Sequence, residues 1–280
     1  MEFQRFNETV PPLSVFIIAQ NEADRIGLTI AAARPLSDDI VVVDSGSTDG
    51  TQAVAEALGA RVIFNPWPGY GQQKRFAEDQ CRHDWLLNLD ADEVLPADLA
   101  AEIAALFAAG EPAADAYKLR IAEIFPGEKA PHRFAYTLAP VRLYRKSKGR
   151  YSPSPVHDRV ELQRGARVGR LKGTIHHFSV RSLGEQMDKL NAYSDAQADD
   201  LDARGATLSA FRLVAEFPAN FFKAYIGRRH ALRGLYGFMT AMNYAFYRYL
   251  RAAKHWERRL RRDAGITPGA DPAGKRPDDG

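Results

Sequence analysis

The chain has 280 residues, of which 45% are hydrophobic and 26% are charged, a composition that excludes intrinsic disorder of the whole and suits one large domain or one domain with an appended module. The net charge of +3 is a cancellation, because residues 1–115 carry 7 Lys and Arg against 19 Asp and Glu, whereas residues 116–280 carry 31 against 16. The two halves, at −12 and +15, are expected to meet different partners.

A single cysteine, Cys81, excludes an intramolecular disulfide and gives no indication of an oxidising compartment. Residues 1–12 contain two glutamates and no apolar run, so they are not expected to be a secretory signal. No run of 18 apolar residues without a charge occurs, and a membrane-spanning helix is therefore not expected. These features predict a cytoplasmic protein, unless it attaches to a membrane surface.

Strands and helices are expected to alternate over the first 110 residues. The strands are predicted at residues 13–19, 39–44, 61–64 and 84–90, and the helices at 23–33, 51–58, 70–83 and from near 96. Because the strands are apolar throughout, a parallel sheet covered on both faces is predicted. The hydroxyls of the turn 45–50 are expected to cap the second helix. Ligands of such sheets bind at the carboxyl ends of the strands, where Asn21, Asp44 and Asp90 stand.

The alternation ends near Tyr117. Short strands and loops rich in Pro, His and Arg are expected as far as Phe178, followed by a polar helix at 182–204 and a basic, aromatic segment at 207–262. The Pro, Gly and Asp content of residues 263–280 predicts a disordered tail.

Three carboxylates, those of Asp90, Asp92 and Glu93, follow the fourth predicted strand. Their mutual repulsion makes the cluster costly unless a cation is bound, and Mg²⁺ or Mn²⁺ held by carboxylates at a pyrophosphate is a common arrangement. The alternative is a solvated turn in which Asp92 caps the helix that begins near Pro96. Asp44 could accept hydrogen bonds from a nucleobase or ribose, or belong to a plain turn. The glycine-rich dinucleotide and phosphate-loop motifs are both missing, so a nucleotide site would depend on acids and a metal.

Three motifs resemble the family-2 glycosyltransferases with the nucleotide-sugar-binding GT-A fold, and they lie in order at 16–22 (FIIAQNE), 41–51 (VVVDSGSTDGT) and 87–93 (LNLDADE). Further segments are similar to the branch that builds the inner core of bacterial lipopolysaccharide, and they lie at 69–77, 141–145, 155–158, 173–178 and 189–194. The resemblance covers residues 13–255, nearly the whole chain.

This resemblance implies an α/β protein with a Rossmann-like, mixed and mostly parallel sheet flanked by helices, and with a basic, aromatic helical segment at the C-terminus. It implies an N-terminal extension at 1–12, a GT-A catalytic domain at 13–205, a helical membrane-association segment at 206–262 and a disordered tail at 263–280. Within the catalytic domain, residues 13–115 would bind the nucleotide sugar and residues 116–205 the acceptor.

The resemblance also implies roles for single residues. The nucleotide sugar would be held by Gln20, Asn21, Glu22, Asp44 and Ser45. Asp90 and Asp92 would hold the ribose and the metal. Lys74 is expected to meet the uracil or the diphosphate, and the alternative is an exposed lysine on a helix.

Inverting transfer needs a base that takes the proton from the acceptor hydroxyl. The candidate is Asp158, with His157 beside it, at a position where the resembled branch usually has Glu. Glu93 is the competing carboxylate. Of the adjacent residues His176 and His177, only one can face the site if both lie on a strand, and His177 is expected to be a third contact to the metal or the diphosphate.

Residues 221–262 carry 11 Lys and Arg, one acid and ten aromatic residues. This composition is typical of interfacial helices, whose rings lie at headgroup depth and whose cations contact anionic lipid. The alternative is a solvated basic face whose aromatic residues pack on the sheet domain. Nucleic acid is not expected as a partner, because no nucleic-acid fold motif accompanies the basic segment and the acidic half would repel phosphates.

Together these features predict a cytoplasmic enzyme that is peripherally associated with the inner face of the cell membrane. It would transfer a hexose, with glucose from a UDP-sugar as the expected donor, to a lipopolysaccharide-core or related glycolipid acceptor, assisted by Mg²⁺ or Mn²⁺. One alternative is a GT-A transferase that acts on polyprenyl phosphate, protein or polysaccharide. The other is a non-enzymatic, basic protein that binds membranes or nucleic acid.

Overall fold

The computed structural model describes residues 11–154 and 158–265 and divides into two compact units, Met1–Arg181 and Ser182–Gly280. Most of the predicted N-terminal extension and of the predicted disordered tail lies outside the described residues. The predicted domain boundary after residue 205 falls inside the second unit, because the helix before this boundary packs against the last helix of the chain.

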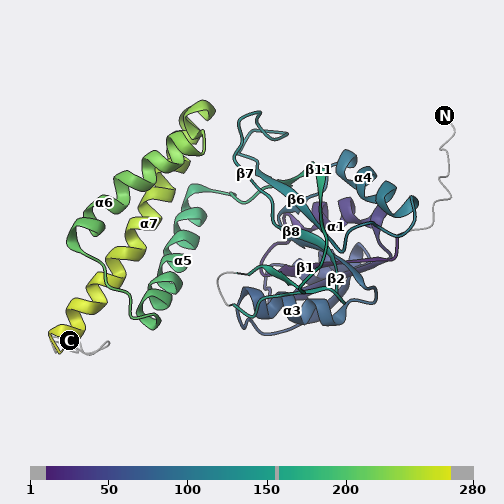
Figure 1. Cartoon of the computed structure of the whole chain (residues 1–280), viewed down its shortest axis with the longest axis horizontal. Helices are drawn as coiled ribbons and strands as arrows, with labels where there is room; N and C mark the ends of the chain where they lie inside the picture. The colour runs from purple at the N-terminus through teal and green to yellow at the C-terminus, as the bar shows by residue number, and fades with distance from the viewer. Residues whose placement is uncertain (1–10, 155–157, 266–280) are drawn as a thin grey trace, which may run out of the picture. The chain divides into compact units, whose positions relative to one another are not determined.

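A mixed sheet forms the first unit, with the strand order β3-β2-β1-β4-β8-β6-β11-β5 and with β7 paired to β6 (Figure 1). Its strands are β1 (Leu13–Ala19), β2 (Asp39–Asp44), β3 (Arg61–Phe64), β4 (Trp85–Asp90), β5 (Glu93–Val94), β6 (Ala116–Glu123), β7 (Thr137–Leu138), β8 (Val141–Arg145) and β11 (Val168–His177). β9 (Gly149–Tyr151) and β10 (Val160–Leu162) pair with each other in antiparallel orientation.

The first four strands lie where they were predicted and pair in parallel. β8 runs antiparallel to both β4 and β6, whereas β11 runs parallel to β6. The parallel pairing predicted from the apolar, alternating strands is therefore confirmed for β1 to β4, and the whole sheet is mixed, as the GT-A resemblance implies. It is mixed because the strand-helix alternation ends after α4, so later strands join the sheet through loops.

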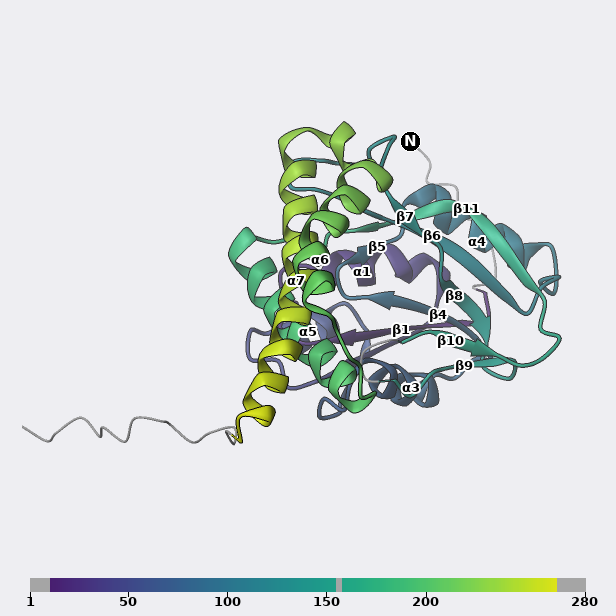
Figure 2. The ribbon, with the colours of Figure 1, turned by 60° about the vertical axis from the view of Figure 1, so that its left-hand side comes forward.

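Helices cover both faces of this sheet. They are α1 (Ile26–Ala33), the short 3-10 helix Arg34–Leu36, α2 (Thr51–Ala57), α3 (Tyr70–Gln80) and α4 (Ala97–Ala108). Because side chains alternate along a strand, Val15 and Ile17 of β1 join an apolar cluster with α1 and α4, whereas Phe16 and Ile18 join a second cluster with α3. Figure 2 shows α3 on one side of the sheet and α1 and α4 on the other.

The carboxyl ends of β1, β2 and β4 lie side by side. Ala19 of β1 is in register with Asp44 of β2, and Ile18 is in register with Asp90 of β4. The buried apolar residues of all three strands give way at this edge to polar and acidic residues. The sheet thus gathers the segments that the sequence singled out as a nucleotide site.

The turn between β2 and α2 differs from the prediction in its hydrogen bonding. Gly50, with a φ of 94°, precedes the first turn of α2, and no side chain caps this helix. The hydroxyls of Ser47 and Thr51 instead donate hydrogen bonds to Asp44 and Asp49. The prediction that the hydroxyls of this turn cap the helix is therefore wrong, because they are used to fix the loop itself.

The second unit is helical. It contains α5 (Leu183–Ala203), α6 (Ala210–Phe222), a π-helical turn (Lys223–Gly227), a 3-10 turn (His230–Arg233) and α7 (Gly234–Asp263). α7 packs against both α5 and α6. Over residues 11–154 and 158–265, no helix combines the length and the hydrophobicity that crossing a membrane requires.

Candidate active site

Asp44 organises the turn that follows β2. Its buried carboxylate accepts hydrogen bonds from the backbone N–H groups of Gly46 and Ser47 at 2.8 and 2.9 Å, from the Ser47 hydroxyl, and from Gln52 Nε2 at 2.7 Å. Burial alone would raise the pKa of Asp44, but the hydrogen bonds from Ser47 and Gln52 hold it below its ordinary value. The carboxylate is therefore charged at neutral pH and shapes the turn 45–47.

Asn21 lies in the loop after β1 in a left-handed backbone conformation, with a φ of 56°. Its side-chain Oδ1 accepts a hydrogen bond from the Thr48 N–H at 2.9 Å, and its own N–H donates to Ser47 Oγ at 2.9 Å. Asparagine is one of the few residues other than glycine that commonly adopt this conformation. Asn21 therefore ties the β1 loop to the β2 turn, and Gln20 beside it is exposed.

The β2 turn is tied in the same way to α3. Ser45 donates its backbone N–H to the Ala19 carbonyl at 3.0 Å, and its hydroxyl oxygen accepts a hydrogen bond from Gln73 Nε2 at 2.9 Å. The Ser45 hydroxyl hydrogen thus points away from Gln73. Three segments predicted to hold the nucleotide are connected by hydrogen bonds.

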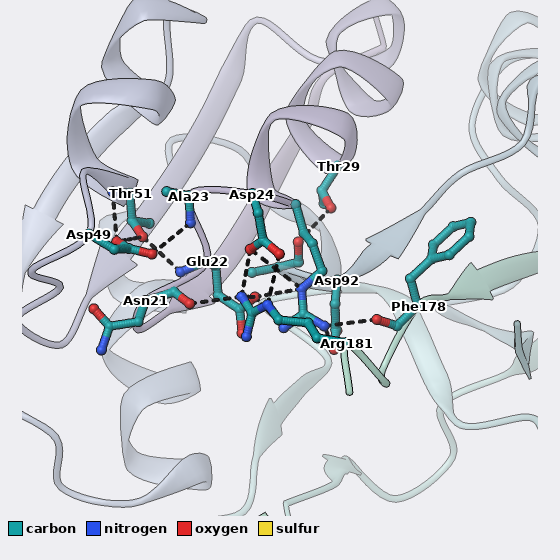
Figure 3. A network of polar contacts seen from close by, with 12 residues as sticks. Asn21, Glu22, Ala23, Asp24, Thr29, Asp49, Thr51, Asp92, Phe178 and Arg181 are labelled. Carbon is teal, nitrogen blue, oxygen red and sulfur yellow. Dashed lines mark hydrogen bonds and ion pairs between the residues drawn. The ribbon is translucent and has the colours of Figure 1, made fainter. Parts of the chain in front are cut away.

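Glu22 is held by two arginines (Figure 3). Its Oε2 accepts hydrogen bonds from Arg25 Nε at 2.9 Å and from Arg181 Nη2 at 2.8 Å, while its backbone N–H donates to Thr51 Oγ1 at 2.8 Å. Arg25 also donates to the Phe178 carbonyl at 2.8 Å. Burial raises the pKa of Glu22 more than the two arginines lower it. Arg25 and Arg181 thereby join the β1 loop to the chain that follows β11.

Asp90 is compensated by cations of the chain itself. Arg142 Nη2 lies 3.1 Å from its Oδ2, and Lys74 Nζ lies 3.0 Å from its Oδ1. Burial would raise the pKa of Asp90, but Arg142 and Lys74 hold it well below its ordinary value. Arg142 reaches this position from β8 and also donates a hydrogen bond to Asn88. The mutual repulsion predicted for the acid cluster is thus relieved at Asp90 without an added ion.

Glu93 is 1% exposed, and both of its carboxylate oxygens are bound within the protein. Oε1 accepts a hydrogen bond from Arg142 Nη2 at 2.8 Å, and Oε2 accepts one from the Asp90 backbone N–H at 2.9 Å. Burial raises the pKa of Glu93. These contacts suit a carboxylate that supports Asp90 and Arg142 better than one that faces an acceptor.

Lys74 of α3 connects two carboxylates. Its side chain is buried, its Nζ lies 2.7 Å from Asp158 Oδ2 as well as 3.0 Å from Asp90 Oδ1, and it lies 5.1 Å from the centre of the Tyr151 ring. Burial lowers the pKa of Lys74, but Asp90 and the other acidic groups raise it above its ordinary value. The alternative of an exposed helical lysine is therefore wrong. His157, the predicted neighbour of the base, lies outside the described residues.

Asp92 is buried and pairs with His177 across the end of β11. His177 Nε2 lies 3.3 Å from Asp92 Oδ1, and Arg25 Nη1 lies 3.8 Å from Asp92 Oδ2. Burial lowers the pKa of His177, but the hydrogen bond to Asp92 outweighs it and raises the pKa to about 9. No side chain caps α4. Asp92 therefore does not cap α4, which was the alternative to a site role.

The donor chemistry of Asp92 and His177 fits a divalent ion. Carboxylate oxygens lie about 2.0–2.1 Å from Mg²⁺, and neutral imidazole nitrogens bind transition metals, so these two donors, 3.3 Å apart, can reach one ion once His177 loses the proton that its raised pKa favours. Asp90 is less available, because Lys74 and Arg142 contact its two oxygens. Among the side chains that the structure describes, no group of three or more His, Cys, Asp or Glu residues is arranged to hold a metal. The remaining ligands would have to be water and phosphate oxygens.

Three arginines at the site were missed by reasoning from the sequence. Arg142 lies in the segment 141–145, which carried part of the family resemblance but no residue role. Arg25 and Arg181 meet at Glu22, although one lies three residues from it and the other lies 159 residues away. Only Arg142 gave a signal in the sequence, because it lies within an otherwise apolar strand and a buried arginine requires an acidic partner.

Comparisons with known proteins identify the family of the chain. The family model described as glycosyl transferase family 2 matches residues 14–171. A glycosyltransferase of Rickettsia felis is 40% identical over 250 residues, which cover 86% of this chain and 88% of the relative. The lipopolysaccharide core biosynthesis glycosyltransferase LpsC of Rhizobium meliloti is 34% identical over 262 residues, which cover 88% and 93%. A solved structure of glucosyl-3-phosphoglycerate synthase from Mycobacterium tuberculosis is 21% identical, with a TM-score of 0.46 over 71% of this chain and 82% of that one.

Proposed function

Because the chain belongs to glycosyltransferase family 2 and is therefore a glycosyltransferase, we propose that it transfers a hexose from a UDP-sugar, with glucose as the expected sugar, to a lipopolysaccharide-core or related glycolipid acceptor. The observation that carries the proposal is the position of Lys74 between two carboxylates, at 3.0 Å from Asp90 and 2.7 Å from Asp158. This contact brings the predicted base of the reaction to the edge of the sheet where the donor is expected.

The donor is proposed to bind at the carboxyl ends of β1, β2 and β4. The turn 45–47, which is fixed by hydrogen bonds to Asp44, includes Gly46 at a φ of 94°, and a glycine lets a ligand approach the backbone closely. Gln20, Asn21, Glu22 and Ser45 border the same edge. The hydrogen bonds among these loops fix their positions before the donor arrives, which lowers the entropy cost of binding it.

Asp158 is proposed as the base. In an inverting transfer its carboxylate takes the proton of the acceptor hydroxyl, the hydroxyl oxygen forms a bond to the anomeric carbon, and the bond between that carbon and the diphosphate breaks, so that UDP leaves with the electron pair. Lys74 Nζ lies 2.7 Å from Asp158 Oδ2 and is proposed to position this carboxylate for the acceptor hydroxyl. His157 is proposed to assist beside it.

Asp92 and His177 are proposed to hold Mg²⁺ or Mn²⁺, with Asp90 nearby on the ribose. A bound divalent ion would supply positive charge to the diphosphate as it leaves. Lys74 and Arg142 compensate the acids at this end of the sheet, which lowers the negative charge that the diphosphate of the donor would meet.

The acceptor and the location of the enzyme are proposed from different observations. The similarity to LpsC favours a lipopolysaccharide-core acceptor over polyprenyl phosphate, protein or polysaccharide. The basic second unit favours peripheral association with the inner face of the cell membrane, since Lys and Arg are attracted to anionic lipid.

Release of UDP and transfer to the acceptor test this proposal. Purified full-length protein is incubated with UDP-glucose or another UDP-hexose, with Mn²⁺, Mg²⁺ or a chelator, and with core oligosaccharide. The wild-type protein is expected to release UDP in a metal-dependent manner, and Asp158→Asn to lose transfer while it keeps its affinity for UDP in calorimetry. Asp188→Asn, an exposed acid of α5, is the matched control.

Two results would overturn parts of the proposal. If no UDP-hexose is turned over by the wild-type protein with either metal, the donor assignment is wrong. If Asp158→Asn transfers sugar at the wild-type rate, the base is another group.

A further inference from the structure

One side of α6 exposes a row of large apolar side chains. Phe211 and Val214 are 82% and 75% exposed, and Phe222 and Ile226 are 57% and 65% exposed. With Pro218, which is also exposed, they recur every three or four residues and form one side of the helix and of the π-helical turn that follows it. We call these five residues the outer stripe. In a soluble helical unit such a side ordinarily faces the core.

The side of α6 that packs within the unit holds two buried polar residues, beside ring contacts of Phe221 and Tyr225 with Phe238 of α7. Glu216 and Asn220 are 8% and 9% exposed. Glu216 Oε1 lies 2.9 Å from Arg251 Nη2 and 3.6 Å from Arg248 Nη2, and both arginines belong to α7. Asn220 Nδ2 donates to the Glu216 carbonyl at 2.7 Å. Ion pairs and ring contacts therefore fix α6 on α7, which Figure 1 draws beside it, and this contact leaves the outer stripe uncovered within the unit.

The charges around the outer stripe have one sign. Glu216 is the single acidic residue between Arg204 and Trp256, and it is buried and paired. Arg212, Lys223 and Arg229 are exposed along α6 and just beyond it. Apolar side chains flanked by cations match the boundary between acyl chains and anionic headgroups. A second copy of the chain would bring the same cations against one another, which disfavours self-association through this side.

We propose that the outer stripe is the edge at which the protein enters an anionic lipid surface, with Arg212, Lys223 and Arg229 on the headgroups. This inference rests on the proposed membrane association and deepens it, because it narrows the contact from the whole predicted segment 206–262 to one side of α6 and of the turn that follows it. Phe221 and Tyr225, two aromatic residues of the segment, stack on each other at 5.2 Å.

Vesicle sedimentation tests the outer stripe with the full-length protein. The triple variant Phe211→Ser, Phe222→Ser, Ile226→Ser is compared with the wild type on vesicles of phosphatidylglycerol and phosphatidylethanolamine at low and high salt. We expect at least a tenfold loss of binding, most visible at high salt, where the contribution of the cations is screened. A double variant of exposed apolar residues in the first unit, Leu138→Ser and Val168→Ser, is the control and should bind as the wild type does.

A fluorescent probe at Val214→Cys gives a readout that does not depend on activity. The native Cys81 is buried, and burial raises the pKa of its thiol to about 12, so the dye bimane should label the new cysteine selectively. Its emission should shift to the blue on vesicles and be quenched by brominated acyl chains. The same probe at Asp188→Cys on α5 should not respond.

Three outcomes would overturn the inference. The first is that the triple variant binds vesicles as the wild type does. The second is that the probe at position 214 stays in water although the protein binds the vesicles. The third is that the wild-type protein does not bind vesicles and forms a dimer in light scattering, and that the triple variant is a monomer. Release of UDP from the donor in solution is measured in parallel. Loss of that activity in the wild type would contradict the proposed transferase donor and not the outer stripe, so the two failures are distinguishable.

Discussion

Replacing Lys74 by methionine removes the ammonium that Asp90 and Asp158 share and keeps a side chain of similar length. The lysine is 3% exposed, so water cannot take the place of the lost cation at full strength. Removing one partner of a buried ion pair costs about 3–5 kcal/mol. Asp90 retains Arg142, and the side chain of Asp158 is 23% exposed, so we expect the lower end of that range, about 3 kcal/mol, in the free energy of unfolding.

Urea unfolding measures this loss. Trp67 and Trp85 lie in the first unit, so a Trp256→Phe background makes tryptophan fluorescence report on that unit. Lys189→Met, an exposed lysine of α5, is the matched control and should change the stability by less than about 0.5 kcal/mol. If Lys74 also meets the diphosphate, the transfer rate should fall roughly 10²–10³-fold, as for the loss of one preorganised electrostatic contact. A stability loss below about 1 kcal/mol, typical of an exposed pair, together with an unchanged rate, would refute this reasoning.

Gly71→Ala should lower the transfer rate and leave the affinity for UDP unchanged. A Cβ at this position would lie 2.1 Å from the Ser152 carbonyl oxygen and would displace the segment that leads to Asp158. A wild-type kcat in steady-state kinetics would contradict this prediction. Arg25→Gln should raise the KM for the donor more than it lowers kcat, because it releases the loop after β1. A variant whose KM equals that of the wild type would refute this role. Burial and neighbouring arginines lower the pKa of the buried His230 to about 4, so the unfolded chain binds a proton more readily between pH 6.5 and 4. The second unit should therefore be fully stable above pH 6.5 and lose on the order of 3 kcal/mol as the pH falls to 4, and thermal unfolding of His230→Gln should show a weaker dependence on pH.

The part of the fold that could be predicted is the part with local signals. β1, β2 and β4 are apolar at almost every position, and α1 to α4 start and stop at glycines, prolines and polar turns that lie close to the predicted bounds. The acids at the end of β4 were predicted to form a site because three of them, Asp90, Asp92 and Glu93, lie within four residues of one another. These signals need no knowledge of distant partners.

The remainder depends on contacts between distant residues. Arg142 lies more than 50 residues from Asp90 and meets it because β8 pairs with β4 in antiparallel orientation, which no local pattern specifies. The buried position of Lys74 depends likewise on Asp158, 84 residues away. The outer stripe lies within the predicted segment 206–262, but composition alone does not tell which apolar side chains stay exposed once α6 packs on α7.

Transfer of hexose to a core acceptor is tested most directly by mass spectrometry of the acceptor itself. Lipopolysaccharide core oligosaccharide is incubated with UDP-glucose, Mn²⁺ and the full-length protein, and the mass of the oligosaccharide is recorded before and after. The proposed function predicts the gain of one hexose residue with the wild-type protein and no gain with Asp158→Asn. An oligosaccharide of unchanged mass, with UDP-glucose consumed to UDP under the same conditions, would contradict the proposed acceptor.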